Sequence, residues 1–226
     1  MKTLLSIICS KKVKYSIILI ILLCIYIFIS AISYVTAVSN DLSDNIFRLH
    51  VIANSDSDED QNLKYIVRDN LIKYMNEISA NANSKEEAIQ IAKEHTNDFY
   101  TIAKQTIIDN GYDYEVNVEI GNFSFPTKYY GDISIPAGYY DALRVKIGKA
   151  SGQNWWCVMF PPLCFVNVSS GIVPAESKEL LQDNLSEEEY SIISDKDSSE
   201  IKFKFKIIEL LQNTNILTAK KYVTSK

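Results

Sequence analysis

The sequence has little of what catalytic and metal-binding proteins usually carry. Only two of its 226 residues are histidine and four are cysteine. It contains no phosphate-binding loop, no Gly-x-Ser-x-Gly elbow, no ligand pair at a zinc spacing and no Asp-x-Asp-x-Asp-Gly calcium loop. We therefore predict a protein that is not an enzyme, holds no metal or cofactor and takes no small-molecule substrate.

Charge is absent from one long stretch near the N-terminus. No charged residue occurs from Tyr15 to Asn40, whereas four lysines precede this stretch and acidic residues follow it. A helix of this length can cross the roughly 30 Å core of a bilayer, with its lysine side in the cytoplasm. We predict a basic cytoplasmic leader over residues 1–14 and a transmembrane anchor or signal peptide over residues 15–40.

The sequence leaves open whether this segment is removed. Its densest apolar part, Ile17 to Ile29, has the length of a signal-peptide core, and Val35-Thr36-Ala37 is a poor small-residue cleavage site. We favour an uncleaved anchor, although secretion after cleavage is the alternative. In both cases the remainder of the chain faces outward.

Basic residues are fewer than acidic ones after residue 40. This part of the chain has 19 basic and 28 acidic residues, which give a formal charge of −9. This excess of acid argues against nucleic acid as a partner. The length suits one domain, and no internal repeat or long low-complexity linker interrupts it. We predict a single extracytoplasmic domain over residues 41–213 and a polar tail over residues 214–226.

Alternating apolar residues predict the strands of this domain. The period is two over residues 46–53, over residues 114–120 and over residues 138–148. Gly121-Asn122 is predicted as the turn of a hairpin whose second arm ends near Tyr130. The aromatic segment 154–165 fits neither period and is predicted as an ordered, partly buried loop, which either plugs the core or forms a partner-binding patch.

Helical spacing of apolar residues appears between these strands. One amphipathic helix follows the polar elbow at residues 54–57 and reaches Ile78, with Ser57 as its cap, and a second runs from Ser84 to Asn110-Gly111. The fold class that follows is α+β, with two amphipathic helices packed on an antiparallel or mixed β-sheet, preceded by one N-terminal transmembrane or signal helix.

The C-terminal part gives weaker signals. Residues 175–185 have helical spacing, and the acidic residues 186–200 are predicted as an exposed loop or short helices. Residues 201–212 alternate like a strand before becoming compatible with a helix. The polar residues after Asn213 are expected to fray.

Cysteine and histidine supply the few candidate reactive groups. Cys157 and Cys164 are the only cysteines after the leader, and an outward-facing compartment permits a disulfide between them. Cys157 and His50 are also the pair that an exported cysteine hydrolase acting on the cell wall would use. We favour the disulfide, with His50 as a hydrogen-bonding strand residue that holds the elbow and His95 as a buried core residue of its helix.

Acidic residues cluster after the elbow, at Asp56, Asp58, Glu59 and Asp60. A helix N-terminus attracts acidic side chains because its free N–H groups carry partial positive charge. Helix capping is therefore a sufficient explanation for the cluster, and we predict no cation site there.

Two long strings, FRLHVIANSDSDEDQNLKYIVRD and FPTKYYGDISIPAGYYDALRVKIGKASGQNWWCVMFPPLCF, occur in this order behind a single export segment. In these the chain resembles the stage II sporulation protein R family of endospore-forming Firmicutes. It departs from the family pattern at Tyr139, where an acidic residue is more usual, and the resemblance ends near Val166.

The resemblance implies a non-enzymatic messenger that is exported from the forespore into the space between the forespore and mother-cell membranes. There it would activate a membrane-embedded aspartic protease that matures the precursor of sigma factor E. The alternatives are the cysteine hydrolase and an envelope domain that binds peptidoglycan through exposed aromatic residues.

A docking face for the protease is predicted from polar residues at strand ends and from tryptophans able to lie at a surface. The predicted residues are Arg48, His50, Asn54, Asp56, Asn154, Trp155 and Trp156.

Overall fold

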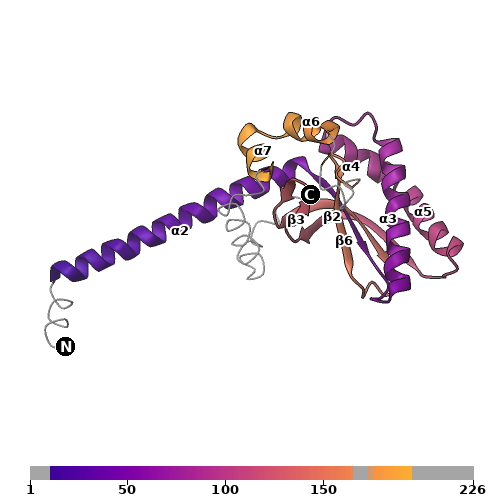
Figure 1. The fold of residues 1–226 in the computed structure, drawn as a ribbon, viewed down its shortest axis with the longest axis horizontal. Coiled ribbons are helices and arrows are strands. Elements are labelled where there is room, and N and C mark those ends of the chain that lie inside the picture. Colours follow the sequence, from indigo (N-terminus) through magenta and orange to yellow (C-terminus); the bar gives the residue numbers. More distant parts are fainter. Residues whose placement is uncertain (1–10, 165–172, 174, 195–226) are drawn as a thin grey trace, which may run out of the picture. The chain divides into compact units, whose positions relative to one another are not determined.

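The computed structural model describes residues 11–164, 173 and 175–194. The chain divides into two compact units, Met1–Val38 and Ser39–Lys226 (Figure 1). The predictions for residues 201–212 and for the polar tail lie outside the described residues.

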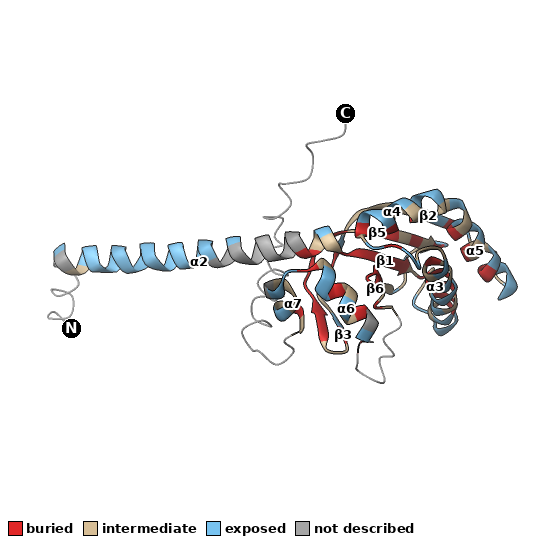
Figure 2. Ribbon diagram, turned by 90° about the horizontal axis from the view of Figure 1, so that it is seen from above, coloured by how far each residue is buried: buried red, intermediate tan, exposed pale blue. Residues whose placement is uncertain are grey.

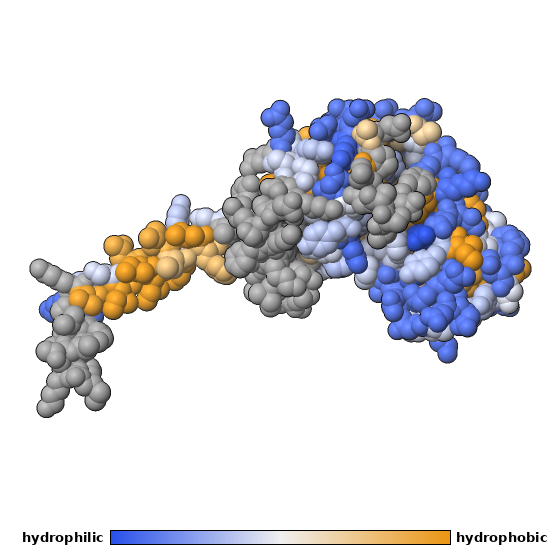
Figure 3. All heavy atoms as spheres, in the orientation of Figure 1, coloured by the Kyte–Doolittle hydropathy of each residue, from blue (hydrophilic) through white to orange (hydrophobic). Residues whose placement is uncertain are grey.

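The N-terminal unit is formed by the apolar helix α2, Lys11–Asn45, which continues into the start of the second unit. Within the described residues, Val13–Ser30 is the one helical stretch that is long and apolar enough to cross a membrane, by length and composition. Its isoleucine and leucine side chains are exposed, and Figure 3 shows the hydrophobic surface that they form along α2. The predicted N-terminal apolar helix is confirmed.

The second unit contains a mixed four-stranded sheet with the order β2-β5-β1-β6. Its strands are β1 (Phe47–Ile52), β2 (Val116–Phe125), β5 (Gly138–Ile147) and β6 (Asn154–Phe160). Strand β1 is parallel to β5 and antiparallel to β6, and β2 is antiparallel to β5. Because β1 lies inside the sheet, its residues are buried except for the half-buried Ile52, as Figure 2 shows in red.

Helices cover one face of this sheet. They are α3 (Asp58–Ile78), α4 (Lys85–Glu94) and α5 (Thr96–Asp109). Tyr65 of α3 meets Trp155 of β6 edge to face, and Lys85 of α4 forms an ion pair with Asp141 of β5 at 2.7 Å. Trp155 and Asp141 pair in register with Val51 and Phe47, so all four side chains lie on the same face. The predicted α+β class, with amphipathic helices on a mixed sheet, is confirmed.

Smaller elements complete the unit. They are the hairpin strands β3 (Lys128–Tyr130) and β4 (Ile133–Ile135), and the helices α6 (Ala175–Asn184) and α7 (Glu187–Ser194). Helix α6 matches the helix predicted over residues 175–185. Helix α7 is one of the short helices allowed for the acidic stretch.

The predicted hairpin around Gly121-Asn122 is wrong. Both residues lie inside the continuous strand β2, where Gly121 pairs with Ala142 and Asn122 pairs with Asp141. The long neighbouring strand β5 offers a backbone partner to every residue of β2, so the ladder outweighs the local turn preference. The chain turns instead at Gly131, which has a φ of 57° between β3 and β4.

Two further predictions need correction. The helix predicted from Ser84 to Asn110 is broken at His95 into α4 and α5. The aromatic segment predicted as a loop begins with the strand β6, because Trp155 and Trp156 point to opposite faces and pair with Val51 and His50 of β1. The last four residues of β6, Cys157 to Phe160, are all buried, so the strand shows no simple alternation of apolar and polar residues, which hid it in the sequence.

The polar elbow after β1 is locked to the loop between β5 and β6. The Asn54 side chain accepts a hydrogen bond from the Lys149 amide and donates one to Asp60. The Gly152 amide donates to the Ala53 carbonyl, and a side chain at residue 152 would place its Cβ 2.1 Å from the Ser55 carbonyl oxygen. Close approach of the two loops therefore requires glycine here.

The same elbow starts helix α3. The Ser57 side chain accepts a hydrogen bond from the Asp60 amide, as the capping prediction requires, and three acidic residues occupy the first turn. Burial raises the pKa of Asp60, but hydrogen bonds from Ser55 and Asn54 outweigh it and hold this pKa below its usual value. The acidic cluster thus lies in the first turn of α3, and its member Asp60 also binds the elbow that follows β1.

Asn54→Ala tests this lock. The change removes two side-chain hydrogen bonds, so we expect the free energy of unfolding to fall by about 2 to 3 kcal/mol in urea titration. Asn62→Ala, at an exposed position of α3, is the control and is expected to cost less than about 0.5 kcal/mol. Equal effects of the two variants would contradict the assignment.

Candidate functional site

The face of the sheet opposite α3, α4 and α5 carries most of the polar side chains of the strands. We define this polar face by the residues whose side chains alternate with the helix-covered ones: Arg48, His50, Glu119, Phe123, Phe125, Tyr140, Arg144, Lys146, Asn154 and Trp156. The hairpin β3–β4 borders it, because the Tyr130 hydroxyl donates a hydrogen bond to the Trp156 carbonyl oxygen at 3.2 Å.

Arg48 is the most unusual residue of the polar face. Its side chain is fully buried, and its guanidinium carbon lies 4.2 Å from the ring centre of Phe125 and 4.8 Å from that of Tyr140. Nη2 donates one hydrogen bond to the Tyr130 hydroxyl at 2.9 Å. Among the described residues, Nε and Nη1 have no hydrogen-bond partner, and no carboxylate pairs with the group. Two aromatic rings offset part of the cost of burying this charge.

His50 lies beside Arg48 on the same strand. Its Nε2 is 2.7 Å from Asn154 Oδ1, and its ring stacks on Trp156 at 5.6 Å between ring centres. Burial lowers the pKa of His50, and the charges of Arg144, Arg48 and Lys146 lower it further. The hydrogen bond to Asn154 raises this pKa, but the lowering effects are larger. The neutral ring is therefore the favoured form.

Positive charge exceeds negative charge across the polar face. Glu119 Oε1 accepts from Arg144 Nη2 at 2.8 Å and pairs with Lys146 Nζ at 2.8 Å, and these contacts lower the pKa of Glu119. Lys128 of the bordering hairpin lies 4.3 Å over the Trp156 ring. Burial and the nearby charge of Arg48 lower the pKa of Lys128.

The structure separates the predicted docking residues into two groups. Arg48, His50, Asn154 and Trp156 come together on the polar face.

The other three lie elsewhere. Asn54 and Asp56 are used inside the elbow, where Asp56 accepts from the Gln153 amide at 2.7 Å. Trp155 points to the helix-covered face, where Arg68 lies 4.2 Å over its ring. Alternation along β6 decides this, since neighbouring residues of a strand face opposite ways.

Cys157 forms a disulfide with Cys164, as predicted from the sequence. Cys157 pairs with Leu49 in the sheet, whereas His50 pairs with Trp156, so the side chains of Cys157 and His50 point to opposite faces. His50 also contacts Asn154 and not the elbow. The structure therefore does not bring together the pair that a cysteine hydrolase would use.

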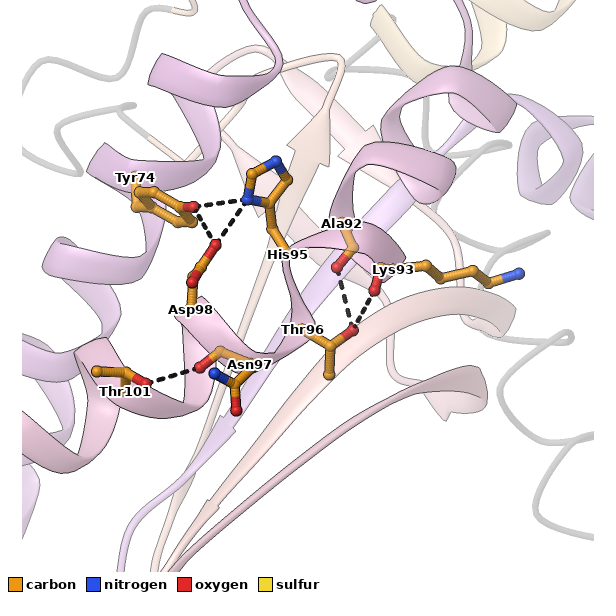
Figure 4. A network of polar contacts seen from close by, with 8 residues as sticks. All are labelled: Tyr74, Ala92, Lys93, His95, Thr96, Asn97, Asp98 and Thr101. Carbon is orange, nitrogen blue, oxygen red and sulfur yellow. Dashed lines mark hydrogen bonds and ion pairs between the residues drawn. The ribbon is translucent and has the colours of Figure 1, made fainter.

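His95, predicted as a core residue, lies instead at the junction of α4 and α5 with 38% of its side chain exposed. Figure 4 shows it with Tyr74 and Asp98: Tyr74 Oη lies 2.8 Å from His95 Nδ1 and 2.7 Å from Asp98 Oδ2. Burial and the Asp98 carboxylate raise the pKa of Tyr74 to about 12. The cluster ties α3 to the helix break and has a structural role.

Sequence reasoning missed the basic and acidic members of the polar face. Arg144 and Lys146 alternate with the apolar Leu143 and Val145, and Glu119 alternates with Val118 and Ile120. This alternation signals that the charged side chains share a face of each strand. Only the pairing of β2 with β5 places Glu119 opposite Arg144.

The lowered pKa of His50 predicts a dependence of stability on pH. The unfolded chain takes up a proton near the ordinary pKa of 6.5, while the folded protein resists it. The stability that His50 contributes is therefore complete above 6.5 and is lost as the pH falls below that value. We compare the free energy of unfolding at about pH 7.5 and at about pH 5.5 by urea titration. We expect it to fall on acidification by less in His50→Gln than in the wild type. His95 is present in both proteins, so its contribution cancels, and equal slopes would contradict the prediction.

Comparison with known proteins gives consistent results. The family model of stage II sporulation protein R matches residues 43–170. The protein named stage II sporulation protein R from Bacillus subtilis (strain 168) is 34% identical over 171 residues, which cover 70% of this chain and 76% of that relative. No solved structure matches the chain. The chain belongs to the stage II sporulation protein R family.

Proposed function

We propose that this protein is an exported sporulation signal that activates a membrane-embedded aspartic protease in the adjoining mother-cell membrane, which leads to maturation of the sigma-E precursor. Membership of a sporulation family supports the signalling role. The observation that carries the proposal is the polar face, where Arg48, His50, Asn154 and Trp156 gather and where no described residue beside them is a free cysteine. These groups are suited to binding a partner rather than to attacking a substrate.

The proposed location is the space between the forespore and mother-cell membranes. Residues 15–40 would anchor the chain or direct its export, with residues 1–14 left in the cytoplasm and the domain of residues 41–213 outside. The disulfide between Cys157 and Cys164 supports an oxidising, extracytoplasmic site. A membrane tether raises the effective concentration of the signal for a partner in a facing membrane.

The proposed docking face is the part of the polar face formed by Arg48, His50, Asn154 and Trp156. Trp156 and Asn154 are partly exposed, whereas Arg48 and His50 are buried, and His50 contacts both exposed residues. The exposed pair would make direct contacts, and the buried pair would set their orientation and charge.

Co-expression with the protease and the sigma-E precursor tests the proposal. Wild-type protein is expected to give processing of the precursor, and the double variant Asn154→Ala/Trp156→Ala to reduce it by at least about tenfold, the loss of a binding hot spot. Tyr100→Ala removes a ring 39% exposed on α5 and is the control expected to keep processing.

Two outcomes would oppose the proposal in different ways. Lack of processing with the wild type would overturn the sporulation signal, whereas full processing with the double variant, folded by circular dichroism, would overturn the docking face.

A further inference from the structure

Unpaired polar atoms are concentrated on the polar face. Within the described residues, five buried side-chain nitrogens lack a hydrogen-bond partner, and four of them belong to Arg48, His50 and Trp156. Buried polar atoms are normally paired, so each exception calls for a reason. These four atoms lie on one face, which points to a common reason for their lack of partners.

The charges on this face and on the hairpin that borders it are also unbalanced. Arg48, Lys128, Arg144 and Lys146 are cationic, and Glu119 is the one carboxylate that pairs with any of them among the described residues. The excess is local, because the chain after residue 40 carries a formal charge of −9. A positive face on an acidic protein is complementary to a negative partner.

Spacing along the strands suggests the shape of this partner. Arg144 and Lys146 are two residues apart on β5, and His50 pairs with Arg144 from β1. Side chains two apart on a strand are separated by roughly 6.5 Å. An extended peptide presents its own alternate side chains at the same interval, so successive carboxylates could meet successive cations.

Burial decides between a peptide and a flat anionic surface. The side chains of Arg144 and Lys146 are only 23% and 34% exposed, and Arg48 is fully buried. A flat layer of headgroups would meet only the exposed parts of Arg144 and Lys146, whereas carboxylates on flexible side chains can reach in between the neighbouring residues. Direct contacts would come from Lys128, Arg144 and Lys146, and Arg48 would act through its uncompensated charge.

We infer that the polar face binds an extended acidic segment of the partner protein, with alternate carboxylates paired to Lys128, Arg144 and Lys146. The inference deepens the proposed function and rests on it for the identity of the partner, which would carry this segment on its extracytoplasmic side. A complex of this kind weakens as salt screens the charges.

Binding of a fluorescent hexaglutamate peptide to the purified full chain in detergent tests the inference, with hexaglutamine as the uncharged probe. We expect hexaglutamate alone to bind, and Lys128→Gln/Lys146→Gln to weaken its binding by at least about tenfold. The control Lys73→Gln/Lys93→Gln makes the same change of charge at exposed positions of α3 and α4 and is expected to bind normally. Equal binding of both peptides, or equal loss in both variants, would overturn the inference.

Arg48→Met adds a readout that a purely structural role would not give. Replacing a buried, unpaired charge by an apolar side chain is expected to leave the stability in urea unchanged or higher, while hexaglutamate binding falls. A large loss of stability would instead assign Arg48 to the core.

Two further measurements separate the possible failures. The first is binding to vesicles of phosphatidylglycerol. If the wild type binds them and Lys128→Gln/Lys146→Gln does not, the ligand of this face is a membrane rather than a peptide, and the inference is overturned. In the processing assay, the wild type and Lys128→Gln/Lys146→Gln are compared. If both give full processing, the binding of an acidic segment is overturned and the proposed function is kept. Hexaglutamate binding without any processing overturns the proposed function and keeps the chemistry of the face.

Discussion

The position of β1 between β5 and β6 is the constraint on which the rest of the second unit depends. Both neighbours reach β1 from later in the chain, so the strand can be completed only after residues 138–160 have folded onto it. The elbow at Asn54 and the loop ending at Gln153 then hold the three strands in register. A central strand must also bury both of its faces, which draws Arg48 and His50 inside.

Burying Arg48 costs stability that a purely structural sheet would avoid. Phe125 and Tyr140 contact its charge, and Tyr130 binds one of its nitrogens, but no described carboxylate neutralises it. Buried charges without a counter-ion are rare because their desolvation outweighs what aromatic contacts return. The polar face is therefore less stabilising than an apolar sheet face would be. Regions that lower stability in this way often serve binding.

The edge of the sheet at β6 is closed by its own surroundings. The Trp156 carbonyl oxygen accepts from Tyr130, and the Val158 carbonyl oxygen accepts from the Leu163 amide beyond the Pro-Pro bend. The disulfide between Cys157 and Cys164 fixes this bend beside the strand. These contacts occupy carbonyl oxygens that would otherwise pair with a strand of another chain, so they block strand addition at this part of the edge.

The sequence by itself determined the apolar N-terminal helix, the helix that follows the elbow, the α+β class and the disulfide, because each rests on local periodicity or on the only two cysteines after the N-terminal apolar segment. The family was likewise evident from strings of residues. Sequence failed at Gly121-Asn122 and at Trp155-Trp156, where pairing with β5 and β1 overrides local preference. Only the tertiary structure decided that Arg48, His50, Asn154 and Trp156 share a face while Asn54, Asp56 and Trp155 do not. Such sharing depends on the register between strands that lie about a hundred residues apart in the chain, and register is set by non-local packing.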